Sequence, residues 1–141
     1  MINDIFVIII IGVIFYTIDI STANKSHYKT CINNKLIQLE LLLHHILNIY
    51  AQFGWVSNNK YLLYGYVITP LLVLSHWSTN NNKCYLTEDI NKKCNIDKNV
   101  PFRDMWYLIG IKNIKYYDTC HKLYLIIGWL IALYKIKYSL P

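Results

Sequence analysis

Four long apolar segments limit what this chain can fold into more than any other feature of its sequence. Residues 5–20 read IFVIIIIGVIFYTIDI, and residues 36–55, 61–77 and 123–138 are also rich in aliphatic and aromatic side chains. Each segment has about 16 to 20 residues, enough for a helix to cross a hydrocarbon core of roughly 30 Å at 1.5 Å per residue. The pattern predicts an all-α fold, an integral membrane four-helix bundle formed by one domain over residues 1–141.

Composition favours the membrane over water. Hydrophobic residues make up 55% of the sequence and charged residues only 16%, which is unusual for a soluble globular domain. Aromatic residues also gather at the segment ends, as they do at membrane interfaces; they are Trp55, Tyr61, Tyr64, Trp77 and Tyr138. A soluble bundle with buried helices is the alternative. It fits less well because the first segment is apolar on all sides rather than along one stripe.

The connections between the segments are unequal. Only VSNNK separates the second segment from the third, which predicts a tight hairpin, whereas residues 78–122 separate the third from the fourth. Within this long loop, FRDMWYLIGIKNIKYY (residues 102–117) mixes aromatic, aliphatic and basic residues at roughly helical spacing. We expect a helix lying at the membrane interface there, with a plain polar loop as the alternative.

The distribution of basic residues predicts the orientation of the chain. Eleven of the 14 Lys and Arg residues fall in residues 21–35 and 78–122, which lie on the same side of the membrane if all four segments cross it. The positive-inside rule then places these two large loops in the cytoplasm and both termini outside.

A cleaved signal sequence is the competing interpretation. Small residues at Ser21 and Ala23 fit a signal-peptidase site, and Asn24-Lys25-Ser26 is a formal glycosylation sequon. Cleavage would leave three helices and place the large loops outside. Against it, the N-terminal region before the apolar segment contains Asp4 and no basic residue, so we favour the retained helix.

The four cysteines share one side of the membrane in either orientation. Cys31, Cys84, Cys94 and Cys120 all lie in the two large loops. Outside the cytoplasm they would form two disulfides in one of three pairings, and inside they would stay reduced. No CxxC motif is present, which argues against zinc-ribbon and thioredoxin-like sites.

A polar stripe runs along the second apolar segment. Glu40, His44, Asn48 and Gln52 recur every four residues and therefore share one face of a helix, with His45 at its border. Ionisable groups inside a membrane are costly unless they are paired, and they mark functional sites by default. We therefore expect the stripe to face the bundle interior or a water-filled cavity.

Antiparallel crossings bring further polar residues to the same half of the membrane. The expected cluster draws on all four segments and comprises Asp19, Glu40, His44, His45, His76 and His121. The run HWSTNNNKCYLTE (residues 76–88) leaves the membrane beside this cluster. Its amides, Cys84 and Glu88 are predicted to cover the mouth of a polar cavity.

Small residues predict where helices approach one another closely. Gly12 shares a face of the first segment with Asp19, and Gly65 and Gly128 begin small-xxx-small pairs in the third and fourth segments.

The segments HHILNIYAQFGW and HWSTNNNKCYLTE resemble small uncharacterised polytopic membrane proteins encoded by large DNA viruses and some bacteria. The resemblance covers the middle third of the chain. Its residues are His44, His45, His76, Trp77, Asn80, Asn81, Asn82, Cys84, Leu86, Thr87 and Glu88. It implies an integral membrane location and points to no particular reaction.

Three hypotheses for function follow from the polar cluster. In the first, its hydrogen bonds hold the helices together, and the protein is a structural or accessory membrane component that acts through its loops, a homo-oligomer or a membrane protein partner. In the second, His44, His76 and Glu40 bind a transition metal or haem, although no HExxH motif is present. In the third, the stripe conducts protons or small solutes in an oligomer.

Other classes of function lack their sequence signatures. The chain has no Gly-rich phosphate loop, no GxSxG motif and no dinucleotide-binding fingerprint. Its net charge of +6 is carried mainly by lysines that flank apolar segments. We therefore expect the lipid bilayer and its anionic headgroups, rather than nucleic acid, as the partner.

Overall fold

The computed structural model describes residues 2–23, 28, 31–98, 100–111 and 117–138, and these residues form helices and connecting loops without a strand. The four long helices are α1 (Ile2–Thr22), α2 (Lys35–Phe53), α3 (Lys60–Thr79) and α6 (Tyr117–Tyr138). A short 3-10 turn, η2 (Gly54–Val56), extends α2, while α4 (Tyr85–Lys93) and α5 (Met105–Leu108) lie between α3 and α6 in the chain. The all-α prediction is confirmed, and each predicted apolar segment falls within a long helix and its extension.

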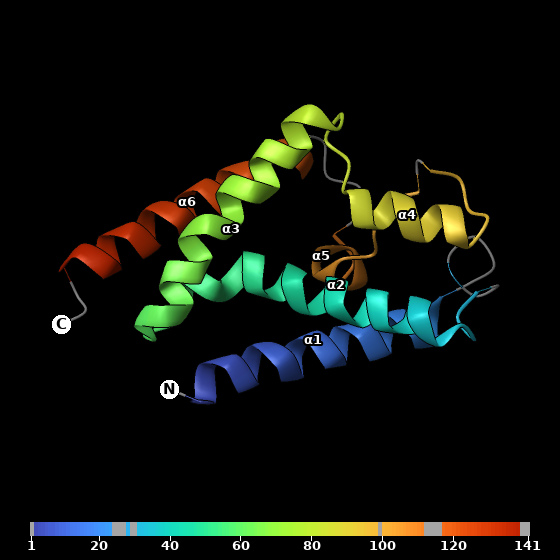
Figure 1. Ribbon diagram of the computed structural model, residues 1–141, viewed down its shortest axis with the longest axis horizontal. Helices are drawn as coiled ribbons and strands as arrows, with labels where there is room; N and C mark the ends of the chain where they lie inside the picture. Colours follow the sequence, from blue (N-terminus) through green and yellow to red (C-terminus); the bar gives the residue numbers. More distant parts are fainter. Residues whose placement is uncertain (1, 24–27, 29–30, 99, 112–116, 139–141) are drawn as a thin grey trace.

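The long helices form two antiparallel pairs. α1 packs along α2, and α3 packs along α6 (Figure 1). The pairs meet near the hairpin between α2 and α3 and are inclined to one another, with α4 and α5 on the side where they diverge (Figure 1). A four-helix bundle in the membrane is therefore not confirmed. The chain between α3 and α6 contributes to the interior instead of forming only an external loop.

Asparagines set the ends of α2 and α3. The side-chain oxygens of Asn34 and Asn59 accept hydrogen bonds from N–H groups in the first turns of α2 and α3, the usual role of an N-cap. Asn80 is the C-cap of α3, and Asn81 and Asn82 have φ angles of 51° and 61°. Asparagine tolerates this left-handed conformation better than most residues. The asparagine run thus ends α3 and turns the chain toward α4.

The long loop is more structured near its start than the sequence indicates. α4 has only nine residues and is polar overall, although Thr87, Ile90 and Asn91 form one buried side at helical spacing. The interfacial helix expected over residues 102–117 is represented only by the single turn α5, and residues 112–116 lie outside the described part.

A disulfide between Cys31 and Cys94 fastens α4 to the loop before α2. Around it, Tyr28, Ile37, Leu41 and Ile90 form a buried apolar cluster. Cys84 and Cys120 are free thiols. Disulfides persist in oxidising compartments, so this bond bears on the sidedness of the two large loops.

Two helices in the described part are long and apolar enough to cross a membrane, α1 over Asn3–Thr22 and α6 over Thr119–Tyr138. This agrees with a membrane location, although a signal sequence near the N-terminus has the same properties as α1. α2 and α3 are less apolar than α1 because of the polar stripe in α2 and the hydroxyl and imidazole groups of α3. A multi-pass topology therefore stays a prediction.

Candidate functional site

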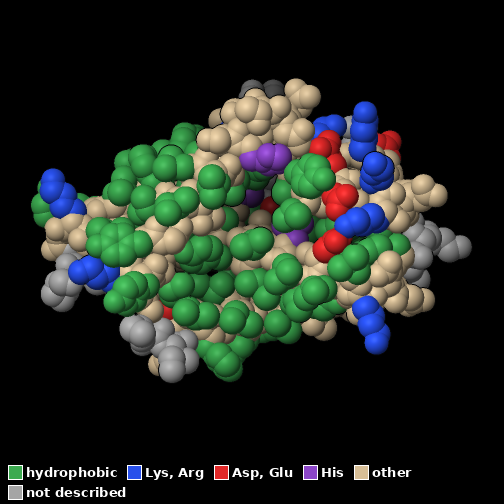
Figure 2. Space-filling model, in the orientation of Figure 1, with side chains coloured by type: hydrophobic (Ala, Val, Ile, Leu, Met, Phe, Trp, Pro, Cys, Tyr) green, Lys and Arg blue, Asp and Glu red, His purple; other side chains and the backbone are tan. Residues whose placement is uncertain are grey.

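An open cavity of about 950 Å³ lies between α2, α3 and α6 and is bordered by the first turn of α4 and by the segments before and after that helix. Much of its wall is apolar, with Leu47 from α2, Leu72 and Val73 from α3, and Leu125 from α6. Figure 2 shows a hollow in this face of the molecule where histidine side chains gather within a largely apolar surface. The run HWSTNNNKCYLTE borders this cavity, where the sequence predicts a mouth.

His44 and Cys84 form the closest pair of reactive groups in the cavity. The Nε2 atom of His44 lies 3.6 Å from Sγ of Cys84, within hydrogen-bonding distance for sulfur. The imidazole of His44 stacks on the ring of Phe102 with 3.7 Å between ring centroids, so its orientation is fixed by packing. Cys84 is the N-cap residue of α4 and makes no side-chain hydrogen bond to the first turn of that helix.

Three polar atoms of cavity-lining residues are buried without a hydrogen-bond partner in the described part of the chain. They are Nδ1 of His44, Oδ1 of Asn48 and Oγ1 of Thr87. Buried polar atoms are rarely left unpaired in proteins, because each costs about 1–3 kcal/mol. Because all three belong to residues around one cavity, a bound molecule or water there would supply their missing hydrogen bonds.

The other two histidines of the cavity are held by neighbouring groups. Nε2 of His76 accepts a hydrogen bond from the backbone N–H of Tyr85 at 3.0 Å. Nε2 of His121 contacts the side-chain amide of Gln52, and its ring lies edge-on to Trp77. These contacts tie the ends of α3 and α6 to α4 and α2.

Polar and charged groups of residues 80–104 surround the mouth. The side-chain N–H groups of Asn80 donate to Oε2 of Glu88 at 2.9 Å and to the carbonyl of Lys83 at 3.0 Å. Three lysines line the cavity, Lys83, Lys98 and Lys122. The carboxylates of Glu88 and Asp104 also line the cavity, so a small excess of positive charge remains to attract an anionic group.

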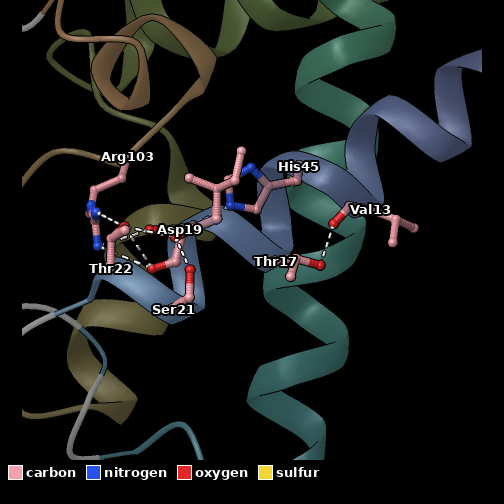
Figure 3. A network of polar contacts seen from close by, with 8 residues as sticks. Val13, Thr17, Asp19, Ser21, Thr22, His45 and Arg103 are labelled. Carbon is pink, nitrogen blue, oxygen red and sulfur yellow. Dashed lines mark hydrogen bonds and ion pairs between the residues drawn. The ribbon is translucent and has the colours of Figure 1, made fainter.

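A second polar cluster joins α1, α2 and the segment before α5 (Figure 3), and its residues do not line the cavity. Oδ2 of Asp19 lies 2.9 Å from Nε2 of His45, and Oδ1 of Asp19 lies 3.1 Å from Nη1 of Arg103. Arg103 also donates to the backbone carbonyl of Asp19 and to Oγ1 of Thr22. Asp19, His45 and Arg103 are only 0%, 1% and 6% exposed, so this Asp19 cluster is sealed from the surroundings and suits a structural role.

Tyr28 adjoins the Asp19 cluster. Burial of the phenol raises the pKa of Tyr28 above its ordinary value, and the nearby Asp19 carboxylate raises it further. Tyr28 is therefore neutral at any ordinary pH and adds no charge next to the Asp19 cluster.

Glu40 lies apart from both groups. Its Oε1 atom is 2.6 Å from Nζ of Lys93, which is also 2.7 Å from Oδ2 of Asp89. Hydrogen bonds to Asp89 and then to Glu40 raise the pKa of Lys93. The pair joins α2 to α4 near the surface, one turn beyond the cavity.

The structure thus divides the candidate residues into three places. Six of them line the cavity, namely His44, Asn48, His76, Cys84, Glu88 and His121. Asp19 and His45 form the separate buried cluster, and Glu40 makes a surface ion pair. No sequence pattern singles out Phe102, whereas Arg103 is the sole arginine of the chain, and arginine is the basic residue best suited to a buried ion pair.

The described residues contain no set of side chains arranged as metal ligands. No group of three His, Cys, Asp or Glu side chains there is suitably placed to hold a metal ion. Of the three predicted ligands, His44 and His76 line the cavity, whereas Glu40 is paired with Lys93.

No protein-family model, curated protein or solved structure matches the chain. The resemblance to small polytopic membrane proteins of large DNA viruses and bacteria therefore stays a prediction, and function has to be inferred from the site.

Proposed function

We propose that the protein is a multi-pass membrane protein with an accessory role, in which the cavity between the two helix pairs holds a small amphiphilic molecule. The observation that carries this proposal is the cavity itself. Its volume of about 950 Å³ is at the upper end of the roughly 300–1,000 Å³ typical of small-molecule sites, which combine apolar walls with a few placed polar groups.

The outer surface supports the membrane part of the proposal. Large apolar side chains are exposed on all four long helices, for example Phe6 on α1, Leu43 on α2, Ile68 on α3 and Ile127 on α6. Water-soluble monomers rarely expose so much contiguous apolar surface. Meanwhile the charged Asp19 cluster is buried, so lipid around the helices accounts for both features.

The polar groups favour an amphiphile with an anionic head. Leu47, Leu72 and Leu125 would contact its apolar part. Lys98 and Lys122 at the mouth would attract its negative charge, and Lys122 already donates to Oδ1 of Asn82 at 2.5 Å. A membrane lipid or a fatty acyl derivative has this combination of groups.

The Cys31–Cys94 disulfide leads us to revise the proposed orientation. Lysine asymmetry alone favours cytoplasmic loops, but a disulfide between the two large loops is typical of an oxidising compartment. We therefore place both loops, and the mouth of the cavity, on the extracytoplasmic side.

The proposal is tested by identifying molecules that copurify with the protein. Protein purified in mild detergent is analysed by native mass spectrometry and by lipid extraction. Val73→Trp fills the cavity from α3, and Ile68→Trp places the same ring on the exposed face of that helix. We expect wild type and Ile68→Trp to retain a stoichiometric amphiphile and Val73→Trp to retain at least about tenfold less.

The proposal fails if wild type carries no such molecule, or if both tryptophan variants retain it equally. Equal loss from both variants, with the disulfide broken, would show only misfolding, so an intact Cys31–Cys94 bond is the folding control for each preparation.

A further inference from the structure

The cavity contains one pair of groups that simple binding does not require. The thiol of Cys84 and the imidazole of His44 are in contact at the polar end of an apolar cavity. We propose that Cys84 is a nucleophile that accepts an acyl group from a long-chain ester or thioester held in the cavity, with His44 acting as its base. This inference rests on the proposed function, since it names the chemical class of the amphiphile.

The surroundings of Cys84 suit a nucleophilic thiol. Reactive cysteines in proteins typically stand at helix N-termini and beside an imidazole, and Cys84 has both neighbours. Its side chain makes no capping hydrogen bond that would occupy the sulfur. The N-terminus of α4 carries a partial positive charge, which would stabilise negative charge that develops near Cys84 during the reaction.

His44 is built into the site as a base would be. Its side chain is 7% exposed, and stacking on Phe102 holds the ring in place. Nε2 faces the sulfur, while Nδ1 has no hydrogen-bond partner in the described part of the chain. Nucleophile–base pairs are recognised by this mutual contact and by a third group that orients the base, a role that Phe102 fills here by packing.

The remainder of the cavity fits the acyl chain. Leu47, Leu72 and Leu125 line it beyond the polar end. An acyl chain lying along this wall would bring its carbonyl carbon to the polar end, where Cys84 lies. Positioning of this kind accounts for a large part of the rate of many enzymes.

The reaction balances without an oxidant or reductant. The Cys84 thiol gives its proton to Nε2 of His44, and the sulfur bonds to the acyl carbonyl carbon. The bond between that carbon and the oxygen or sulfur of the donor breaks, and the His44 imidazolium returns the proton to this leaving group. The products are an alcohol or a thiol and a thioester on Cys84.

Two donors share this chemistry, and the experiment separates them. Purified full-length protein is incubated with vesicles of an alkyne-labelled phospholipid or, in a second arm, with an alkyne-labelled acyl-coenzyme A. The label on the protein is located by mass spectrometry and tested for release by neutral hydroxylamine, which cleaves thioesters. We expect hydroxylamine-sensitive label on Cys84 in one arm, and that arm identifies the donor.

Matched variants distinguish the pair from a merely accessible thiol. Cys120 is also free and is exposed, so Cys120→Ser should leave labelling unchanged, whereas Cys84→Ser should abolish it. His44→Gln should slow labelling by about 100-fold or more, the usual contribution of a positioned base. As a second readout, the rate of Cys84 alkylation by iodoacetamide should change its dependence on pH in His44→Gln, and an intact Cys31–Cys94 bond checks folding.

Each outcome decides between the proposals. A copurifying amphiphile without any thioester on Cys84 overturns this inference and leaves the proposed function standing. Absence of both overturns both. Equal labelling of Cys84 and Cys120, or labelling and alkylation of Cys84 that do not change in His44→Gln, also overturns the role of the pair.

Discussion

Asp19 illustrates how a charge is accommodated in the interior of this protein. Its two carboxylate oxygens contact His45 and Arg103 separately, and all three side chains are buried. A lone carboxylate in this position would be strongly unfavourable, but two partners on different elements distribute the charge and join α1 to α2 and to the segment before α5.

Removing Arg103 should therefore be costly. Arg103→Met leaves the Asp19 carboxylate buried with one fewer partner, and loss of one member of a buried ion pair typically costs about 3–5 kcal/mol. We expect a decrease of this size in the free energy of unfolding, measured by detergent-induced unfolding in mixed micelles.

Lys93 provides the matched control for Arg103. It pairs with Glu40 and Asp89, but these side chains are about a quarter to a third exposed, and solvent-exposed pairs contribute little. Lys93→Met should leave unfolding almost unchanged. If both variants unfold alike, the Asp19 cluster does not stabilise the fold in the way described.

At the scale of elements, the pairing of α1 with α2 depends on a glycine. A Cβ atom added to Gly12 would lie 2.7 Å from Cγ1 and 2.9 Å from the backbone Cα of Ile46. The backbone of α2 cannot move aside as a flexible side chain can. The small residue therefore permits the close approach that brings Asp19 to His45.

Gly12→Val should consequently separate the two helices. Overpacking of this kind costs about 1–3 kcal/mol, and here it would also weaken the contact between Asp19 and His45. We expect a lower free energy of unfolding in the same mixed-micelle measurement. Val13→Leu enlarges the neighbouring, exposed position on α1 and should have little effect; a loss as large as that of Gly12→Val would argue against close packing at Gly12.

For the molecule as a whole, the Cys31–Cys94 disulfide stabilises the fold and also bears on which side of the membrane the large loops lie. Cys31 and Cys94 are 63 residues apart in the sequence, so their bond closes a long loop that includes α2 and α3. Loops of this length are those for which a disulfide most strongly restricts the unfolded chain, and removing a native disulfide from a small domain typically costs about 2–5 kcal/mol.

The orientation is tested by counting and locating thiols. In denatured, unreduced protein from cells, we expect a maleimide to modify Cys84 and Cys120 alone, and all four cysteines after reduction. In intact cells, an impermeant maleimide should reach the exposed Cys120. Four reactive cysteines before reduction, with labelling only after permeabilisation, would instead support cytoplasmic loops.

Local patterns in the sequence predict much of the helical structure and part of the site. The apolar segments correspond to α1, α2 with η2, α3 and α6 because length and hydropathy act along the chain. The four-residue spacing of His44, Asn48 and Gln52 places them on one face of α2 because a helix turns once in 3.6 residues, and all three line the cavity. α4 was not predicted because it is only nine residues long and polar overall, although its buried residues recur at helical spacing.

Local patterns could not predict which side chains from distant segments come into contact. His45 is adjacent to His44, yet it turns to α1 and Asp19, while His44 faces Cys84, forty residues along the chain. Asp19 and Arg103 are 84 residues apart. No periodicity in either segment indicates that these two side chains meet.

The sequence by itself determined the helical class of this protein, its apolar surfaces and the face of α2 that carries His44, because these follow from spacing and side-chain chemistry along one segment. Only the tertiary structure decided that Glu40 leaves the polar cluster for Lys93, that Asp19 and His45 form a sealed group with Arg103, and that His44 and Cys84 share a cavity. The physical reason is that the inclination of two helix pairs and the path of the chain between them select which faces meet, and this selection depends on packing throughout the molecule.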